Sequence, residues 1–275
     1  MNDTILTRIA RDTRELVAHR KKHAPIAYLE DQPYFQSPTL SLKQALSSPT
    51  ISVIAEIKQA SPSKGVIRPD LQATEIARQY KLNGAAAISV LTEPLYFKGS
   101  LERLRRVRQY VDLPLLRKDF ILDSYQLYEA RAYGADAVLL IATMLEADEL
   151  AELYETATML GLECLVEVYH EEDLEKVDVQ QVAILGVNNR DLHTFKVDVS
   201  RGVALLERLP ESLIKVSESG LASADELALL EARGIHGALI GETLMKAVEP
   251  GRKLRELLEG VAHLKKQNTP LRLVG

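Results

Sequence analysis

Short apolar runs rich in β-branched residues recur along this chain, and stretches with helical periodicity separate them. From residue 51 onward the runs follow one another at intervals of roughly 20 to 40 residues. Eight can be identified: Ile51–Lys58, Ala85–Leu91, Pro114–Asp119, Asp136–Ile141, Glu163–Val168, Val182–Val187, Leu213–Ser217 and Gly237–Gly241. Strands that alternate with helices form parallel sheets with both faces covered, which explains their near-continuous apolar character. The pattern predicts an α/β protein.

Signals for helix ends support this interpretation. Capping boxes open two of the intervening helices, one at Thr143 with Glu146 and one at Ser223 with Glu226. Four glycines stand where a helix would end before the next strand: Gly84, Gly134, Gly161 and Gly234. Eight such units predict a closed (β/α)8 barrel, the TIM barrel. An open doubly wound sheet is the alternative, but no G-x-G-x-x-G motif follows a strand.

The first 49 residues lack this alternation. Residues 3–23 place Ile5, Leu6, Ile9, Leu16 and Val17 on one helical face. We expect this helix to end near Pro25 and a second short helix to run over Ser41–Leu46. Residues 1–49 are therefore predicted to form an N-terminal helical extension on a barrel formed by residues 50–265. Because no linker interrupts the sequence, residues 1–275 are expected to form a single domain.

Composition excludes several classes of protein. The formal net charge is −5 and basic residues are scattered, so binding to nucleic acid is not expected. The longest apolar run, Ala137–Leu145, is far shorter than the roughly 20 residues that span a bilayer, so no membrane segment is expected. A single cysteine, Cys164, fits a reducing cytoplasmic compartment and excludes thiolate metal sites. The sequence does not determine the oligomeric state, and a monomer is compatible with it.

Polar residues gather at the carboxyl ends of the predicted strands. In a barrel these ends meet at one mouth. They carry Glu56, Lys58, Lys118, Glu167, Asn188, Arg190, Glu218 and Ser219. Alternation along each strand directs three carboxylates and two lysines toward one cavity. At an effective dielectric of about 20, charges 4 Å apart couple by roughly 4 kcal/mol, which is enough to set up a general acid and a general base. A purely structural salt-bridge cluster is the alternative.

Two glycine-containing loops are candidates for phosphate binding. Ser217–Gly220 follows the seventh predicted strand and Ile240–Glu242 the eighth. Loops at these two positions commonly bind phosphate through backbone N–H groups. Ser61 and Ser63, after the first strand, could add hydroxyl groups. The alternative is that these glycines only turn the chain.

Other reactive residue types fit structural roles better. Lys215 is out of phase with the carboxylate three residues later, so it should point toward the helices. Arg117 and Asp119 have the opposite parity to Lys118 and are expected to pair outside the barrel. Cys164 fits core packing. His170 is expected to cap a helix after the fifth strand.

Seven segments resemble the signature blocks of one enzyme family. They are IAEIKQASPSKG (Ile54–Gly65), SVLTEPLYFKGS (Ser89–Ser100), PLLRKDFILD (Pro114–Asp123), LECLVEVYH (Leu162–His170), GVNNRDL (Gly186–Leu192), VSESG (Val216–Gly220) and ALIGETLM (Ala238–Met245). Together they resemble the indole-3-glycerol-phosphate synthase family over residues 50–250. The resemblance implies a (β/α)8 enzyme of tryptophan biosynthesis that uses no cofactor or metal. Its small phosphorylated substrate, 1-(2-carboxyphenylamino)-1-deoxyribulose 5-phosphate, undergoes ring closure, decarboxylation and dehydration.

The resemblance also implies catalytic roles. Lys118 matches the principal general acid, which protonates the substrate carbonyl during ring closure. Lys58 matches the lysine that holds the substrate carboxylate and acts in the later dehydration. Glu56 and Glu167 match the carboxylates of proton transfer, and their division of labour stays open.

Further positions match substrate-binding residues of the family. Asn188 and Glu218 match residues that orient the substrate's hydroxyls and amine, Arg190 a binding arginine, and Phe97 a residue beside the anthranilate ring. Ser61, Ser219, Gly220 and Gly241 match the substrate and phosphate loops. Leu239 and Glu242 are also expected to bind substrate, Glu242 through its backbone, because its side chain varies in the family. Many members carry a basic residue where this chain has Ala60, so that position is given no role.

Two other functions remain open at this point. One is the isomerisation of a neighbouring intermediate, as in phosphoribosylanthranilate isomerase, which would need one acid and one base but not two lysines at the mouth. The other is a phosphate-ligand binder without catalysis, in which ligand binding would survive loss of Lys118.

Overall fold

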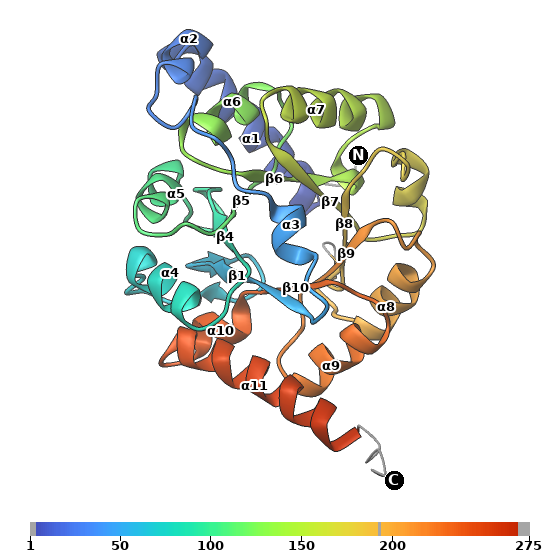
Figure 1. The fold of residues 1–275 in the computed structure, drawn as a ribbon. Coiled ribbons are helices and arrows are strands. Elements are labelled where there is room, and N and C mark those ends of the chain that lie inside the picture. Colours follow the sequence, from blue (N-terminus) through green and yellow to red (C-terminus); the bar gives the residue numbers. More distant parts are fainter. Residues whose placement is uncertain (1–3, 192–193, 269–275) are drawn as a thin grey trace.

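The computed structural model describes residues 4–191 and 194–268. Eight parallel strands close into a barrel in the order β1-β10-β9-β8-β7-β6-β5-β4 (Figure 1). The strands are β1 (Ser52–Ile57), β4 (Ala87–Leu91), β5 (Leu115–Lys118), β6 (Ala137–Ile141), β7 (Glu163–Val168), β8 (Ile184–Asn188), β9 (Ile214–Glu218) and β10 (Gly237–Ile240). Each of the eight predicted runs contributes one barrel strand. The prediction of a TIM barrel is confirmed, and the open sheet is excluded.

Helices surround this barrel and connect its strands. They are α4 (Ala73–Leu82), α5 (Leu101–Arg108), α6 (Tyr125–Ala132), α7 (Ala147–Met159), α8 (Val199–Glu207), α9 (Ala224–Ala232), α10 (Glu242–Lys246) and α11 (Pro250–Asn268). Two connections contain short 3-10 helices, η1 (Ala142–Met144) and η2 (Glu172–Lys176). A small hairpin of β2 (Ala60–Ser61) and β3 (Gly65–Val66) follows β1, where the sequence predicted only a loop.

Most of the predicted helix ends are confirmed. Ser223 and Glu226 form the expected capping box of α9, and the four glycines predicted to end helices all have positive φ. The box predicted at Thr143 is wrong, because Thr143 lies in η1. Glu146 is the N-cap of α7, and it forms a box with Glu149 instead. His170 is not a helix cap either, since η2 begins after Glu171.

The N-terminal residues form the predicted helical extension, with one helix more than expected. It consists of α1 (Ile5–His23), α2 (Ile26–Glu30) and α3 (Leu42–Leu46). Residue 3, where the first predicted helix starts, lies outside the described residues. Pro25 follows α1 as predicted but also serves as the N-cap of α2, because proline is tolerated at a helix start.

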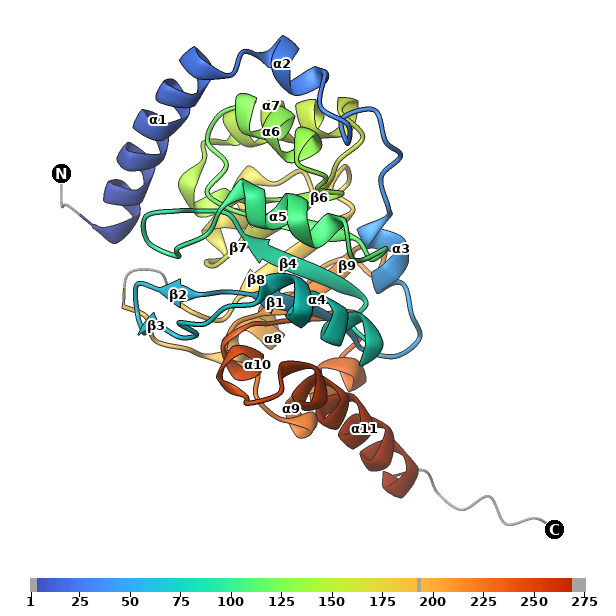
Figure 2. The ribbon, with the colours of Figure 1, turned by 90° about the vertical axis from the view of Figure 1, so that its left-hand side faces the viewer.

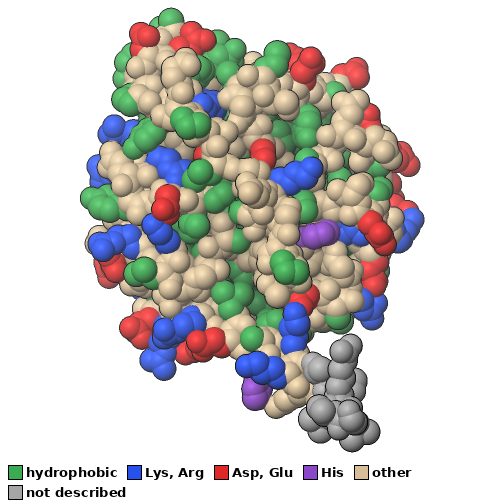
Figure 3. Space-filling view, viewed as in Figure 1, with side chains coloured by type: hydrophobic (Ala, Val, Ile, Leu, Met, Phe, Trp, Pro, Cys, Tyr) green, Lys and Arg blue, Asp and Glu red, His purple; other side chains and the backbone are tan. Residues whose placement is uncertain are grey.

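The extension contacts both ends of the barrel. Figure 2 shows α1 and α3 on opposite sides of the strands. Leu6 and Ile9 of α1 line the cavity at the carboxyl ends of the strands. Leu42 and Leu46 of α3 are fully buried and pack with the residues inside the barrel. The helix α3 therefore closes the amino end of the barrel. Figure 3 shows the same face, on which acidic and basic side chains are interspersed.

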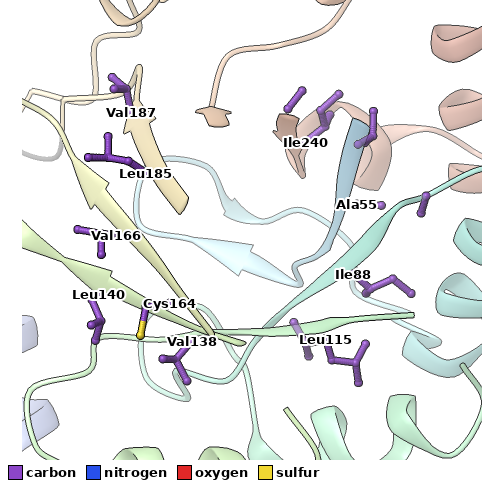
Figure 4. Packing of buried hydrophobic residues seen from close by; sticks show 14 of the residues in the cluster. Ala55, Ile88, Leu115, Val138, Leu140, Cys164, Val166, Leu185, Val187 and Ile240 are labelled. Carbon is purple, nitrogen blue, oxygen red and sulfur yellow. The ribbon is translucent and has the colours of Figure 1, made fainter. Parts of the chain in front are cut away.

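Strand residues alternate between two buried clusters. Inward side chains such as Ile54, Leu116 and Leu165 fill the barrel. Outward side chains, among them Ala55, Leu115, Cys164 and Val166, pack against the helices (Figure 4). Cys164 is thus a core residue, as predicted, and burial raises the pKa of its thiol.

Arg117 and Asp119 pair with each other as predicted, although Asp119 also borders the cavity at the mouth. Arg117 is fully buried, and its Nη2 lies 3.0 Å from Asp119 Oδ2 and 3.1 Å from Glu129 Oε2 of α6. Burial lowers the pKa of Lys215. The carboxylates of Glu211 and of Glu207, the last residue of α8, partly offset this effect, because a nearby negative charge raises the pKa of a lysine. These groups therefore support the wall of the barrel. Lys118 has the opposite parity to Arg117 and Asp119, so its side chain faces inward.

Candidate active site

A cavity of about 620 Å³ opens at the carboxyl ends of the strands. This volume is typical of pockets that bind small molecules. All of the predicted site residues except Glu218 line it: Glu56, Lys58, Ser61, Phe97, Lys118, Glu167, Asn188, Arg190, Ser219, Gly220, Leu239, Gly241 and Glu242. Glu218 is fully buried and reaches the cavity through its contact with Lys118. The structure therefore brings the predicted residues together.

Lys118 stands at the centre of three carboxylates from three other strands. Its Nζ donates to Glu218 Oε2 at 2.6 Å. Glu56 Oε2 and Glu167 Oε2 lie 3.8 and 3.9 Å from the same nitrogen. The Lys118 side chain is only 15% exposed, so solvent screens these interactions weakly. An ammonium group is thus held among carboxylates in a site largely shielded from solvent.

This arrangement separates the pKa values of the four groups. Burial by itself disfavours the Lys118 ammonium, but the charges of Glu218, Glu56 and Glu167 outweigh it and raise the pKa of Lys118. Burial and the neighbouring charge of Glu218 raise the pKa of Glu167 to about 8, against the opposing effect of Lys118. For Glu56, burial is outweighed by Lys58 and Lys118, and its pKa is lowered. One carboxyl can therefore hold a proton at neutral pH beside an ionised one.

The first strand supplies a second lysine. Glu56 and Lys58 form an ion pair at the end of β1, and both border the cavity. Lys58 lies one residue beyond β1, yet its side chain and that of Glu56 border the same cavity, as the alternation of side chains predicted.

Two glycines leave room for the carboxylates. An added Cβ at Gly186 of β8 would overlap Glu218 Oε1 and would lie 3.1 Å from Leu165 Cδ1. An added Cβ at Gly241 would overlap the carboxylate of Glu56. The cluster around Lys118 therefore depends on the absence of side chains at both positions.

We expect Gly186→Ala to destabilise the protein by about 1–3 kcal/mol, the usual cost of overpacking a core. The Glu218 carboxylate should also be displaced from Lys118, which lowers turnover. Urea denaturation measures the destabilisation caused by Gly186→Ala, first in the parent and then in a Glu218→Ala background. Because the second substitution removes the overlapping atoms, the cost should shrink there. An unchanged cost in both backgrounds would contradict the explanation.

Basic side chains collect at one end of the cavity. Lys64, Arg190 and Lys246 line it there together with Glu242. Arg190 Nη2 lies 3.2 Å from Glu242 Oε2, and Lys246 Nζ lies 2.6 Å from Glu242 Oε1. The adjacent turn contains Ser219 and Gly220. Their φ values are 69° and 81°, in the left-handed region.

Apolar side chains form another part of the cavity wall. Phe97 and Phe120 have ring centroids 6.0 Å apart, and Leu6 and Ile9 of α1 complete this part. Glu93 holds the loop that carries Phe97, because its carboxylate accepts the backbone N–H groups of residues 95, 96 and 97. The wall provides an apolar surface with two aromatic rings, of the kind that can bind an aromatic ring.

Sequence reasoning missed several of these residues. Phe120 has the same parity as Lys118 and lies two residues beyond it, so parity alone could have identified it. Leu6, Ile9, Lys64 and Lys246 gave no comparable signal, because nothing in their spacing places them at the mouth.

Within residues 4–191 and 194–268, no three His, Cys, Asp or Glu side chains are arranged to hold a metal ion. None of the helices in those residues is both long and apolar enough to cross a membrane.

The fold and the cavity define a TIM-barrel enzyme with its ionisable groups at the carboxyl ends of the strands. The fold resembles that of KGPDC from Streptococcus mutans, with a TM-score of 0.60 and 14% identity over 78% of this chain and 98% of that one. A family model described as indole-3-glycerol phosphate synthase matches residues 6–257. The chain belongs to the indole-3-glycerol phosphate synthase family.

Two relatives illustrate this membership. The indole-3-glycerol phosphate synthase of Salinibacter ruber is 54% identical over 256 residues, covering 92% of this chain and 95% of the relative. That of Dehalococcoides mccartyi strain BAV1 is 45% identical over 261 residues, covering 92% of this chain and all of the relative.

Proposed function

We propose that this protein converts 1-(2-carboxyphenylamino)-1-deoxyribulose 5-phosphate to indole-3-glycerol phosphate, releasing CO₂ and water, in tryptophan biosynthesis. Family membership over residues 6–257 supports the reaction. The observation that carries the mechanism is the position of Lys118, whose Nζ lies within 4 Å of three carboxylates from separate strands. The reaction needs a proton donor and a proton acceptor in one pocket, and this cluster supplies both.

Lys118 is the general acid of ring closure in this proposal. The aromatic carbon that bears the carboxylate attacks the substrate carbonyl, and Lys118 protonates the carbonyl oxygen as its negative charge develops. Its raised pKa keeps the lysine charged at neutral pH. Loss of CO₂ then returns the bonding electrons to the ring.

Dehydration completes the reaction. The new hydroxyl leaves as water and needs one proton, while the ring system gives up another. Lys58 would hold the substrate carboxylate and then act as an acid, and its position at the cavity beside Glu56 supports this role. Glu56 and Glu167 are the proposed proton carriers, and their opposite pKa shifts suit an acceptor and a donor.

The two ends of the cavity suit the two ends of the substrate. Phe97 and Phe120 would contact the aromatic ring, and Leu239 lies on the cavity wall. Asn188 and Glu218 would orient the hydroxyls and the amine. The phosphate would be bound by Arg190 and the loops that contain Ser61, Ser219, Gly220, Gly241 and Glu242, the last through its backbone. Holding both ends supplies much of the rate enhancement by orientation.

We also propose a cytoplasmic location, where reducing conditions keep Cys164 as a thiol. The acid and the base are side chains of the protein, so the proposal includes no metal or cofactor, and none of its steps involves nucleic acid or a membrane. The N-terminal extension contributes Leu6 and Ile9 to the cavity, which supports a single functional unit rather than a separable barrel.

The test is product formation from the purified substrate. The chain contains no tryptophan, so indole fluorescence of the product can be followed over a low protein background. We expect fluorescence to rise with the release of one CO₂ per product. Binding of the substrate without product would instead indicate a non-catalytic binder. Conversion of phosphoribosylanthranilate, with no indole formed, would indicate an isomerase.

A further inference from the structure

Asn189 has no role in the mechanism above, yet it is fully buried and makes specific contacts. It directly follows Asn188, the last residue of β8, and its side chain contacts the residues that flank Glu218 at the end of β9. Its Nδ2 donates to Ser217 Oγ at 3.0 Å and to the carbonyl oxygen of Ser219 at 2.8 Å. Its backbone N–H donates to the carbonyl of Glu218 at 2.8 Å.

These contacts hold a turn that is unfavourable by itself. Ser219 has a φ of 69°, a left-handed conformation that residues with a Cβ adopt only where the surroundings enforce it. Gly220 follows with a φ of 81°. The hydrogen bond from Asn189 to the Ser219 carbonyl is therefore placed where the turn needs support.

The orientation of the Asn189 amide follows from its partners. A carbonyl oxygen only accepts, so the NH₂ group must face Ser219, and the oxygen Oδ1 must face the other way. There it lies against Gly202 of α8, where an added Cβ would overlap it. The amide thus fits the space between α8 and the turn in one orientation.

The same bond determines where a neighbouring N–H group points. The carbonyl of Ser219 and the N–H of Gly220 belong to one planar peptide group, and this peptide is trans. In a trans peptide the two bonds point in opposite directions. Because Asn189 holds the carbonyl, the N–H of Gly220 points away from Asn189, and the turn itself borders the cavity.

We propose that Asn189 is a positioning residue for phosphate binding: it holds the Ser219–Gly220 peptide so that its N–H group faces the phosphate of the substrate. Asn189 itself does not contact substrate. The inference rests on the proposed function, because that function places the phosphate at this turn.

The test uses Asn189→Ala in the full chain, with inorganic phosphate as the probe in calorimetric titration and as an inhibitor of turnover. The variant loses the hydrogen bond to the Ser219 carbonyl, which orients the turn, and the one to Ser217 in β9, so the phosphate Kd should rise at least about tenfold. The KM for the substrate should rise by a similar factor, while kcat at saturating substrate should change much less.

Gln126→Ala is the matched control. Gln126 of α6 is also a buried amide with two hydrogen bonds. Its Nε2 donates to the carbonyl of Phe120, and its Oε1 accepts from the N–H of Leu122. Its loss should lower thermal stability to a similar extent and leave the phosphate Kd near that of the parent. If Asn189→Ala behaves like this control, with phosphate affinity retained, the residue is only structural and the proposal is wrong.

Asn189→Asp gives a second test that keeps the size of the side chain. An ionised carboxylate repels the Ser219 carbonyl, whereas a protonated carboxyl can donate to it. Phosphate affinity relative to the parent should therefore recover as pH falls from 8 to 5, and equal ratios at both values would overturn the proposal. A parent protein that forms no product would refute the proposed function instead, which separates the two failures.

Discussion

Lys118→Ala should lower turnover at least about 100-fold while the fold is retained, because general-acid catalysis contributes a factor of this size or larger. Lys118 Nζ lies within 4 Å of Glu218, Glu56 and Glu167. No other described lysine has this environment, since Lys58 pairs with Glu56 alone. The loss should appear in kcat, because the proton donated in the transition state is removed.

A matched lysine makes the result interpretable. Lys215 is also a buried strand lysine, but it faces the helices instead of the cavity. Lys215→Ala should therefore keep kcat near that of the parent, even if stability falls. Circular dichroism checks that both variants fold, and stopped-time assays of indole fluorescence measure turnover. Near-normal turnover of Lys118→Ala would remove this lysine from the mechanism.

Glu167→Gln should lose turnover and gain stability, and the gain should grow with pH. Burial and the charge of Glu218 raise the pKa of Glu167 from its usual 4.5 to about 8. Between these values the unfolded chain releases the proton that the folded chain still holds. The free energy of unfolding therefore falls as pH rises through this interval. Since one pKa unit corresponds to about 1.4 kcal/mol, removing the group should recover on the order of 4 kcal/mol at pH 8.

Glu56→Gln is the control with the opposite sign. The pKa of Glu56 is lowered, mainly because Lys58 and Lys118 outweigh its burial. Its stabilising contribution is present at neutral pH and is lost as pH falls. The Gln variant at position 56 should therefore be less stable than the parent at pH 8. Urea denaturation at pH 5 and pH 8 distinguishes the two. Equal destabilisation by both substitutions at pH 8 would show that the pKa of Glu167 is not raised in the folded protein.

Local patterns in the sequence predicted most of the barrel. Each apolar run became a strand because a parallel strand covered on both faces is apolar over most of its length. Ser223 capped α9 because the capping box is formed within four residues. The error at Thr143 has a tertiary cause: its hydroxyl donates to Asp173 Oδ2, at the start of η2, instead of capping α7.

The alternation of side chains along each strand was enough to predict the site residues that lie on the barrel strands. Glu56, Lys118 and Glu167 face one cavity because side chains on a strand alternate and the strands of a barrel end at one mouth. The roles of these residues stay predictions until the variants are measured. Parity could also have included Phe120, two residues beyond Lys118.

The sequence by itself determined which side chains point inward and in which order the strands follow, because both depend on a period of two and on short connections. Only the tertiary structure decided which carboxylate lies 2.6 Å from Lys118 and which lies almost 4 Å away. It also placed α1 at the mouth and Asn189 under the turn at Ser219. Such contacts join residues far apart in the chain, and their distances depend on the packing of the whole barrel. Electrostatic energies change steeply with these distances, so the pKa values follow from the fold.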